Sequence, residues 1–399
     1  MKGMSYSMAE ERVRLTRPTS SGENILHPET EVAQITDFEE GVQQVASGLS
    51  ITSVPMVDDY SYRPELFKVV TSGTYAYKGI IIPAGLRVMV NGRYYEAVND
   101  TEVDIPSTIT AANRKGKDLY IYAVENPDTS STTPVFVISM DSTYPSGYTA
   151  DTSRKIGGFH CLCADVGTKA YTGSSHPLYN RVAGDILPAS RWDLVHRPNS
   201  SPEGMVYDEA SNIWVDIYLS SLSGSGASGK LLSVYNAATT DGGSTSKFHW
   251  YKYVEYFART KKRLPWQSEF MQFSLGSNQG TNIKGSADVT NTGGHEDTNS
   301  KRMISNIGVE DCCGFLDQWG LDRGGSSTTG TSWANAADAN DDNGASGYGQ
   351  HYAAPNCILL GGDWTNGACC GSRFSRWDRG PLYLHSVVGA RGVSSPLNP

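Results

Sequence analysis

The sequence predicts a β-rich α+β protein built from consecutive parts. Its 399 residues include 42 Gly and 22 Tyr together with abundant Ser and Thr, a composition typical of strands joined by many turns. Short apolar runs separated by turn residues recur between residues 67 and 166, whereas one long helical pattern is confined to the N-terminal region. A chain of this length is long enough for two or three domains.

Residues 28–49 predict a helix. Pro28 and Thr30 stand at its start, and apolar residues follow at three- and four-residue steps from Val32 to Leu49. This stripe needs a partner, and two arrangements remain open: self-association as a short bundle, or packing of one amphipathic helix on its own domain. We therefore interpret residues 1–66 as an N-terminal segment with an oligomerising or attachment helix.

Residues 67–166 predict a β-sandwich-like spacer domain. Asn91-Gly92 joins two short strands as a hairpin, because both residues accept the positive φ angles of a type I′ turn. Further strands are expected at 119–124, 135–140 and 159–164, and several short strands at this spacing are typical of a sandwich. We find no catalytic constellation in this part of the sequence.

Residues 167–190 contain Gly, Ser and Pro without periodicity and are expected to be a linker. The last part, residues 191–399, opens with a strand-turn-strand pattern that ends near residue 219. Aromatic residues at helical steps in 246–262 predict a helix, and Pro265 suits the first turn of another.

The final segment, residues 361–399, alternates two kinds of position. One kind is a frame of Gly, Trp, Ser, Pro, Leu, Ala and Arg. We expect its larger side chains to be structural, Trp by packing and Arg by hydrogen-bonding loop carbonyls; these are Trp364, Arg373, Trp377 and Arg391. The other kind shares no size, charge or polarity, so no single packing role explains it. These variable positions are Asp363, Thr365, Asn366, Ala368, Cys369, Cys370, Phe374, Ser375, Asp378, Arg379, Tyr383, His385, Val387 and Val388.

The variable positions share a property of their codons. Randomising the two adenines of the codon AAC can produce every residue type found there, but never Lys, Glu, Gln, Met or Trp. Lys, Glu, Gln and Met are absent after Gly361, although the preceding chain uses all four. The frame residue types can all be encoded without adenine. A mutator directed at adenine would therefore change the variable positions and leave the frame unaltered.

This pattern resembles the variable region of target proteins of diversity-generating retroelements, a family that includes the phage major tropism determinants. Over the last two hundred residues, Arg263-Leu264-Pro265, the segment 304–320 and Gly-Ala-Arg-Gly-Val at 389–393 are similar to the formylglycine-generating-enzyme branch of the C-type-lectin fold. The resemblance implies a C-type-lectin-like domain over residues 191–399. It also implies a phage tail-fibre tip protein that binds a bacterial surface receptor, protein or glycan, through the variable positions.

The same resemblance implies a homotrimer in the virion that is attached to other tail proteins through its N-terminal part. A bacterial or prophage-encoded surface-displayed protein of the same retroelement system is the alternative. The N-terminus lacks the apolar core of a signal peptide, and no apolar run is long enough to span a bilayer. We therefore expect synthesis in the host cytoplasm without membrane insertion. The formal charge of −9 argues against a nucleic-acid partner.

An enzyme and a metal site are two further alternatives for this sequence. Formylglycine-generating oxidases use a reactive cysteine pair, but the adjacent pairs Cys312-Cys313 and Cys369-Cys370 suit that chemistry poorly, so no enzymatic activity and no catalytic cofactor are expected. The sequence from 338 to 344 begins like a calcium loop but lacks the Gly and Glu of an EF-hand. An irregular structural calcium site remains an alternative, with Asp338, Asn340 and Asp342 as its candidates.

Overall fold

The computed structural model describes residues 6–9, 12–19, 22–25, 66–243, 246–325 and 332–397. Near the N-terminus, three strands that the sequence analysis did not predict form an antiparallel sheet: β1 (Tyr6–Ala9), β2 (Arg12–Thr19) and β3 (Gly22–Ile25). The helix expected at residues 28–49 lies outside the described residues.

The second part of the chain consists of antiparallel sheets that share one core. The larger sheet has the order β10-β9-β11-β12 and the smaller one the order β4-β5-β8, and β6 pairs with β7 as a hairpin. Ile80, Val88 and Ile121, one from each of these three groups, belong to the same buried cluster. The strands are β4 (Lys68–Val69), β5 (Gly79–Ile82), β6 (Arg87–Val90), β7 (Arg93–Glu96), β8 (Thr101–Asp104), β9 (Asp118–Val124), β10 (Val135–Ser139), β11 (Ser153–His160) and β12 (Trp192–Asp193).

The Asn-Gly hairpin prediction is confirmed. Strands β6 and β7 are joined by Asn91 and Gly92, whose φ angles are 49° and 70°. The strand expected at 159–164 is shifted, because β11 begins at Ser153 and ends at His160. Its first half is polar and contains a bulge, and Gly157 is required there since a Cβ would lie 2.6 Å from the Trp192 carbonyl oxygen.

Residues 167–190, expected to be a linker, form part of the packed structure. Ala170, Leu178 and Leu187 are buried in a cluster that also contains residues of the C-terminal part, and Ile186 belongs to the core of the second part. The segment is therefore irregular, but its apolar side chains are buried in the two cores. This segment contains two short 3-10 turns, η2 (Gly173–Ser175) and η3 (Pro188–Ser190).

The C-terminal part contains a mixed sheet with the order β21-β20-β17-β22 and an antiparallel sheet with the order β13-β14-β23. Because β23 pairs with β14, the last strand of the chain lies beside one of the first strands of this part. The strands are β13 (Met205–Asp208), β14 (Ile213–Asp216), β15 (Ser220–Ser223), β16 (Lys230–Ser233), β17 (Asp317–Gly324), β18 (Trp333–Asn335), β19 (Gln350–Tyr352), β20 (Asn356–Gly361), β21 (Gly371–Arg379), β22 (Val388–Gly389) and β23 (Val393–Ser394).

The described helices are short. Helix α2 (Ala111–Arg114) is a single turn, α3 (Trp250–Ala258) lies within the predicted span 246–262, and α4 (Gln267–Phe273) follows Pro265. The Glu269 carboxylate accepts the Trp266 N–H at 2.8 Å and so caps α4. Two further 3-10 turns are η4 (Gly226–Ser228) and η5 (Gly367–Cys369).

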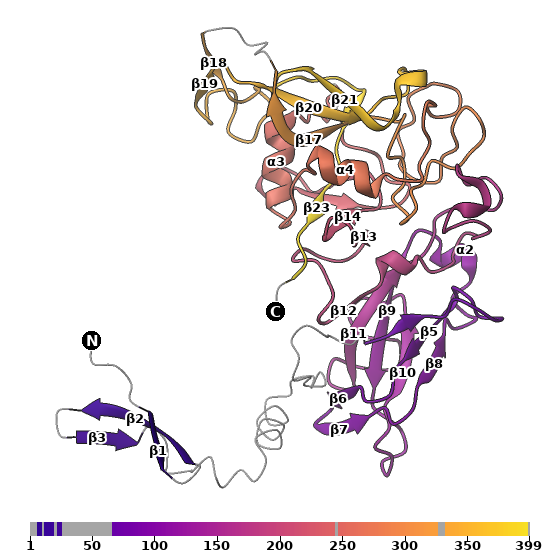
Figure 1. Ribbon diagram of the computed structural model, residues 1–399, viewed down its shortest axis with the longest axis vertical. Coiled ribbons are helices and arrows are strands. Elements are labelled where there is room, and N and C mark those ends of the chain that lie inside the picture. Colours follow the sequence, from indigo (N-terminus) through magenta and orange to yellow (C-terminus); the bar gives the residue numbers. More distant parts are fainter. Residues whose placement is uncertain are drawn as a thin grey trace.

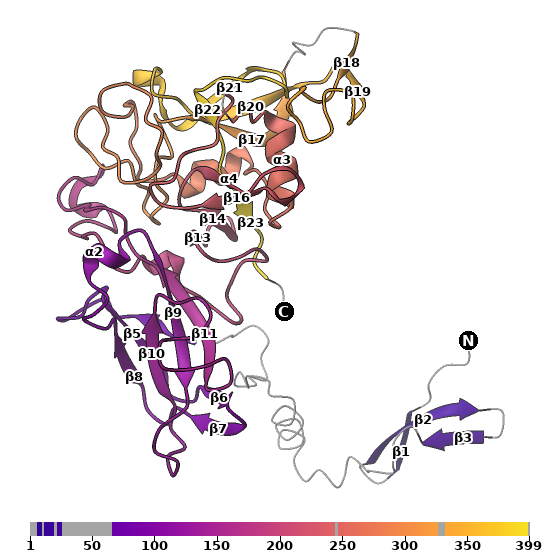
Figure 2. The same ribbon diagram turned by 180° about the vertical axis from the view of Figure 1, so that it is seen from behind.

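Strands β20 and β21 lie at the end of the molecule farthest from the sheet of β9, β10 and β11 (Figure 1). The view from behind shows the same arrangement, with α3 and α4 between the two regions (Figure 2). None of the described helices has both the length and the apolar character needed to cross a bilayer. Strand β21, which carries several of the variable positions, is held at this distal end of the molecule (Figures 1 and 2).

Candidate functional site

Strand β21 forms one edge of the four-stranded sheet and carries several variable positions. Its pairing with β20 is irregular: Leu360 lies opposite Ser375, but the next residue, Gly361, lies opposite Gly371. The extra residues on β21 make the strand bulge, and a bulge at a sheet edge changes the direction in which side chains point. Along β21, Arg373, Ser375 and Asp378 are exposed.

Most of the variable positions are at the surface. We call these residues, which include both exposed and half-buried side chains, the distal face. They are Thr365, Asn366, Ala368, Cys369, Phe374, Ser375, Asp378, Arg379, Tyr383 and His385.

Four variable positions are buried, which the sequence analysis did not anticipate. Val388 is in β22, where it pairs with β17 inside the sheet, and Val387 is 8% exposed. The Asp363 carboxylate accepts both the backbone N–H and the hydroxyl of Thr365, each at 2.6 Å, so it caps a turn. Cys370 is 3% exposed. In the chain as described, these four side chains are not available for direct contact with a ligand.

Four distal-face residues form a continuous row of contacts. The Arg379 guanidinium forms an ion pair with the Asp378 carboxylate at 2.7 Å, and its central carbon lies 4.7 Å from the centre of the Tyr383 ring. The Tyr383 and His385 rings are stacked at 6.0 Å with 9° between their planes. The row therefore presents a charged pair followed by two aromatic rings.

Arg376, which the sequence analysis placed neither in the frame nor among the variable positions, connects this row to the core. Its Nε donates to Asp378 at 2.7 Å, and its Nη1 lies 3.6 Å from the carboxylate of Asp317. The hydrogen bond from Arg376 holds the pKa of Asp378 below its usual range. The presence of Arg in the sequence does not show whether the side chain connects to the core or points into solvent.

Asp317 is a fully buried carboxylate beneath the distal face. Neither of its oxygens has a hydrogen-bond partner. Burial raises its pKa to about 8, and the negative charge of Asp363 contributes in the same direction. Arg376 and Arg379 oppose this shift but do not cancel it. The side chain is therefore predominantly neutral at pH 7.

The frame residues differ in their surroundings. Arg391 is fully buried and donates to the backbone carbonyls of Asp216, Ile217 and Glu310, which confirms the structural role predicted for it. Trp364 is 8% exposed. The same structural role was predicted for Arg373, but this prediction is wrong, because the side chain is exposed on β21.

The cysteines do not form a reactive pair. All seven are free thiols, and burial raises the pKa of Cys312 to about 12 and that of Cys313 well above its ordinary value. A nucleophilic cysteine needs a lowered pKa, because the thiolate is the reactive form. Cys312 and Cys313 therefore act as small buried apolar residues.

The calcium candidates form hydrogen bonds within the protein. The Asp342 carboxylate accepts hydrogen bonds from Arg259 at 2.7 Å and from Tyr256 at 3.1 Å, whereas Asp338 accepts the Asn340 backbone N–H. Over the described residues, no three or more His, Cys, Asp or Glu side chains gather as a metal site requires. The loop is instead fastened to α3 by its acidic side chains.

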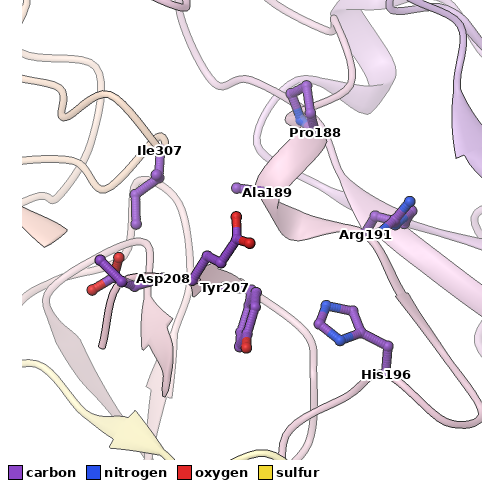
Figure 3. A pocket seen from close by; sticks show the side chains of 9 residues that line it. Pro188, Ala189, Arg191, His196, Tyr207, Asp208 and Ile307 are labelled. Carbon is purple, nitrogen blue, oxygen red and sulfur yellow. The ribbon is translucent and has the colours of Figure 1, made fainter. Parts of the chain in front are cut away.

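An open cavity of about 530 Å³ lies away from the distal face, between η3 and the end of β13. Figure 3 shows Ile307 on one side, Pro188 and Ala189 on the other, and Tyr207 beside His196. The His196 and Tyr207 rings pack edge to face at 4.6 Å. No residue predicted as a site from the sequence lines this cavity.

The chain is similar in sequence to known proteins. Residues 71–193 match the family model described as the second domain of Mtd. The chain is 30% identical over 337 residues to the tail fiber receptor-binding protein of Bordetella phage BPP-1, and the match covers 79% of each chain.

Two solved structures extend the similarity to most of the fold. The M1 variant of the major tropism determinant has a TM-score of 0.67 and 27% identity, with 88% of each chain covered. The I1 variant has a TM-score of 0.66 and 26% identity, with 97% of this chain and 93% of that chain covered. This chain belongs to the family of phage tail-fibre receptor-binding proteins that contains the major tropism determinant.

Proposed function

We propose that this chain is the tip of a phage tail fibre, which binds a bacterial surface receptor through its distal face and acts in adsorption rather than catalysis. The observation that carries the proposal is the coincidence of two independent properties. Most positions whose residue types fit adenine randomisation lie at the surface of the distal end, whereas the frame residues Trp364 and Arg391 are buried beneath them. Diversity is tolerated at such a surface because exposed substitutions change stability little.

The row from Asp378 to His385 supplies the chemistry of recognition. Tyr383 and His385 offer rigid flat surfaces with few rotatable bonds, which suits contact at low entropic cost. Arg379 and Asp378 offer charged donors and acceptors next to them. The residue types here represent one selected variant, so the face can serve a protein or a glycan receptor. In this proposal the second part is a sandwich-like spacer, and the N-terminal segment attaches to other tail proteins.

Replacing five distal-face residues should redirect binding without unfolding the protein. We expect a variant with Phe374→Ser, Asp378→Asn, Arg379→Thr, Tyr383→Ser and His385→Asn to lose adsorption to a recognised strain by at least tenfold. The removed ion pair and ring contacts are near the surface and contribute about 1 kcal/mol or less each. Adsorption to a panel of bacterial strains and the melting temperature would be measured together.

The matched control changes exposed tyrosines of the second part. Tyr94 and Tyr144 are 44% and 45% exposed, and their replacement by Ser should leave adsorption unchanged. Unchanged adsorption of the five-residue variant, with the same strain preference and affinity, would contradict the proposal and place the receptor site elsewhere.

We also expect a homotrimer. The apolar stripe of residues 28–49 favours self-association, and three linked copies would convert a weak contact into useful avidity. Light scattering at micromolar concentration should give about three times the chain mass of 43.2 kDa. A monomer mass would exclude this assembly, and it would leave the assignment of the distal face intact.

A further inference from the structure

The hairpin of β18 and β19 carries an exposed face that lies outside the variable segment. Trp333 is 68% exposed, more than any other large apolar side chain of the described residues, and Tyr352 is 52% exposed. These two residues are directly opposite each other, with ring centres 5.5 Å apart. Exposed aromatic side chains in contact with each other mark a surface suited to binding.

An amide pair lies beside the aromatic pair. Asn335 is opposite Gln350 in the same register, and Gln350 Nε2 donates to Asn335 Oδ1 at 3.2 Å. Because side chains two residues apart share a face of a strand, the four side chains project on one side of the hairpin, with about 7 Å between the pairs. Each amide retains donor or acceptor capacity beyond this bond. We call these four residues the hairpin face.

We propose that the hairpin face binds carbohydrate, namely one or two sugar units of a bacterial surface glycan. A sugar ring has a C–H-rich face that packs on an aromatic ring, with partly positive hydrogens against the negative π face. Its hydroxyl groups both donate and accept, which matches side-chain amides. Because the aromatic pair and the amide pair are about 7 Å apart, an amide lies next to a sugar ring that is stacked on Trp333 or Tyr352.

Size and charge favour this ligand over a protein partner. A stable protein interface needs about 800 Å² on each side, far more than four side chains on two three-residue strands provide. Neither strand contains Asp, Glu, Lys or Arg, so the hairpin face is neutral, as is much of the surface of a sugar.

The hairpin face is held in place before any ligand arrives. The loop that follows β18 is fastened to α3, because His249 contacts the Asp341 carboxylate at 2.8 Å and Arg259 donates to Asp342 at 2.7 Å. A pre-positioned surface loses less conformational freedom on binding. The hairpin connects β17 to β20 and lies at the same end of the molecule as β21 (Figures 1 and 2).

This inference rests on the proposed function in one respect only: the hairpin face meets the host surface if the distal end does. The distal face consists of variable positions, whereas the hairpin face does not. Trp cannot arise by randomising the adenines of AAC, and Trp333 precedes the variable segment. The hairpin face would thus supply a constant, weak contact with surface glycan while the distal face selects the receptor.

The test is a printed array of bacterial surface oligosaccharides probed with the full-length protein. We expect the unaltered protein to bind a set of these glycans, and the double variant Trp333→Ala with Tyr352→Ala to bind the same set at least tenfold more weakly. Asn335→Ala, which leaves the rings intact, should weaken binding by a smaller factor. Tyr75→Ala, at a tyrosine that is 48% exposed in the second part, is the matched control and should bind normally.

Three results would overturn the inference: no glycan bound by the unaltered protein, undiminished binding by the double variant, or a change in its mass by light scattering, which would identify a second copy as the occupant. Melting temperatures would show that each variant is folded. Failure of the proposed function would instead appear in the adsorption of the distal variant, so the two outcomes are distinguishable.

Discussion

Replacement of Arg391 by Ala is expected to prevent stable folding of the C-terminal part. The guanidinium donates to the carbonyls of Asp216, Ile217 and Glu310 and to the side chain of Gln318, at distances between 2.6 and 2.9 Å. Each buried acceptor left without a donor costs about 1–3 kcal/mol. The sum approaches the whole stability of a typical domain, about 5–15 kcal/mol. Soluble yield and thermal unfolding followed by circular dichroism would measure this loss.

Arg373→Ala is the matched control for this prediction. It removes the same side chain from the same segment, but from an exposed position on β21, and should shift the melting temperature by no more than about 2 °C. Equal melting temperatures for the Arg391 variant and the unaltered protein would show that the buried hydrogen bonds of Arg391 do not support the fold.

Asp317→Asn is expected to make the protein more stable at alkaline pH. The pKa of Asp317 is about 8 in the folded chain and has an ordinary value of 3.8. Between these values the folded chain binds a proton that the unfolded chain has lost, so stability falls as the pH rises. The penalty is complete above pH 8 and amounts to roughly 6 kcal/mol, at about 1.4 kcal/mol for each pKa unit. An uncharged Asn avoids this loss.

The measurement is the free energy of unfolding by denaturant from pH 4 to pH 9 for both proteins. Their difference, in which the other titrating groups cancel, should grow in favour of the variant as the pH rises toward 8 and then level off. Asp378→Asn, an exposed carboxylate with a lowered pKa, should not show this dependence. A difference that stays constant with pH would mean that Asp317 is ionised throughout this range.

Local sequence signals predicted local structure well. Asn91-Gly92 specifies its turn because few other residues accept the required backbone angles, and the apolar runs that became β9 and β10 are long enough to be recognised alone. Structure that depends on distant contacts was not predicted. The buried segment 167–190 has no periodicity, since its side chains pack on two different cores.

For the candidate site, too, local features were predicted and features that depend on distant contacts were not. The pattern of residue types predicted fourteen variable positions, and most of them are exposed or half-buried. It carries no information on burial, so it included Val388, which becomes interior only through parallel pairing of β22 with β17. Asp317 and Trp333 lie outside the patterned segment. Only the fold brings the first beneath the distal face and places the second at the same end of the molecule.

The pairing of β23 with β14 has a consequence for how the chain is made. Val393 and Ser394 lie opposite Val215 and Trp214, so these strands join residues almost at opposite ends of the C-terminal part. Contacts between such distant residues form late, and here they require Val393 and Ser394 to have left the ribosome. A chain truncated before Arg391 lacks both this strand and the buried guanidinium. Folding of the C-terminal part thus requires synthesis to have passed β23, so chains that stop before this strand cannot complete the sheet.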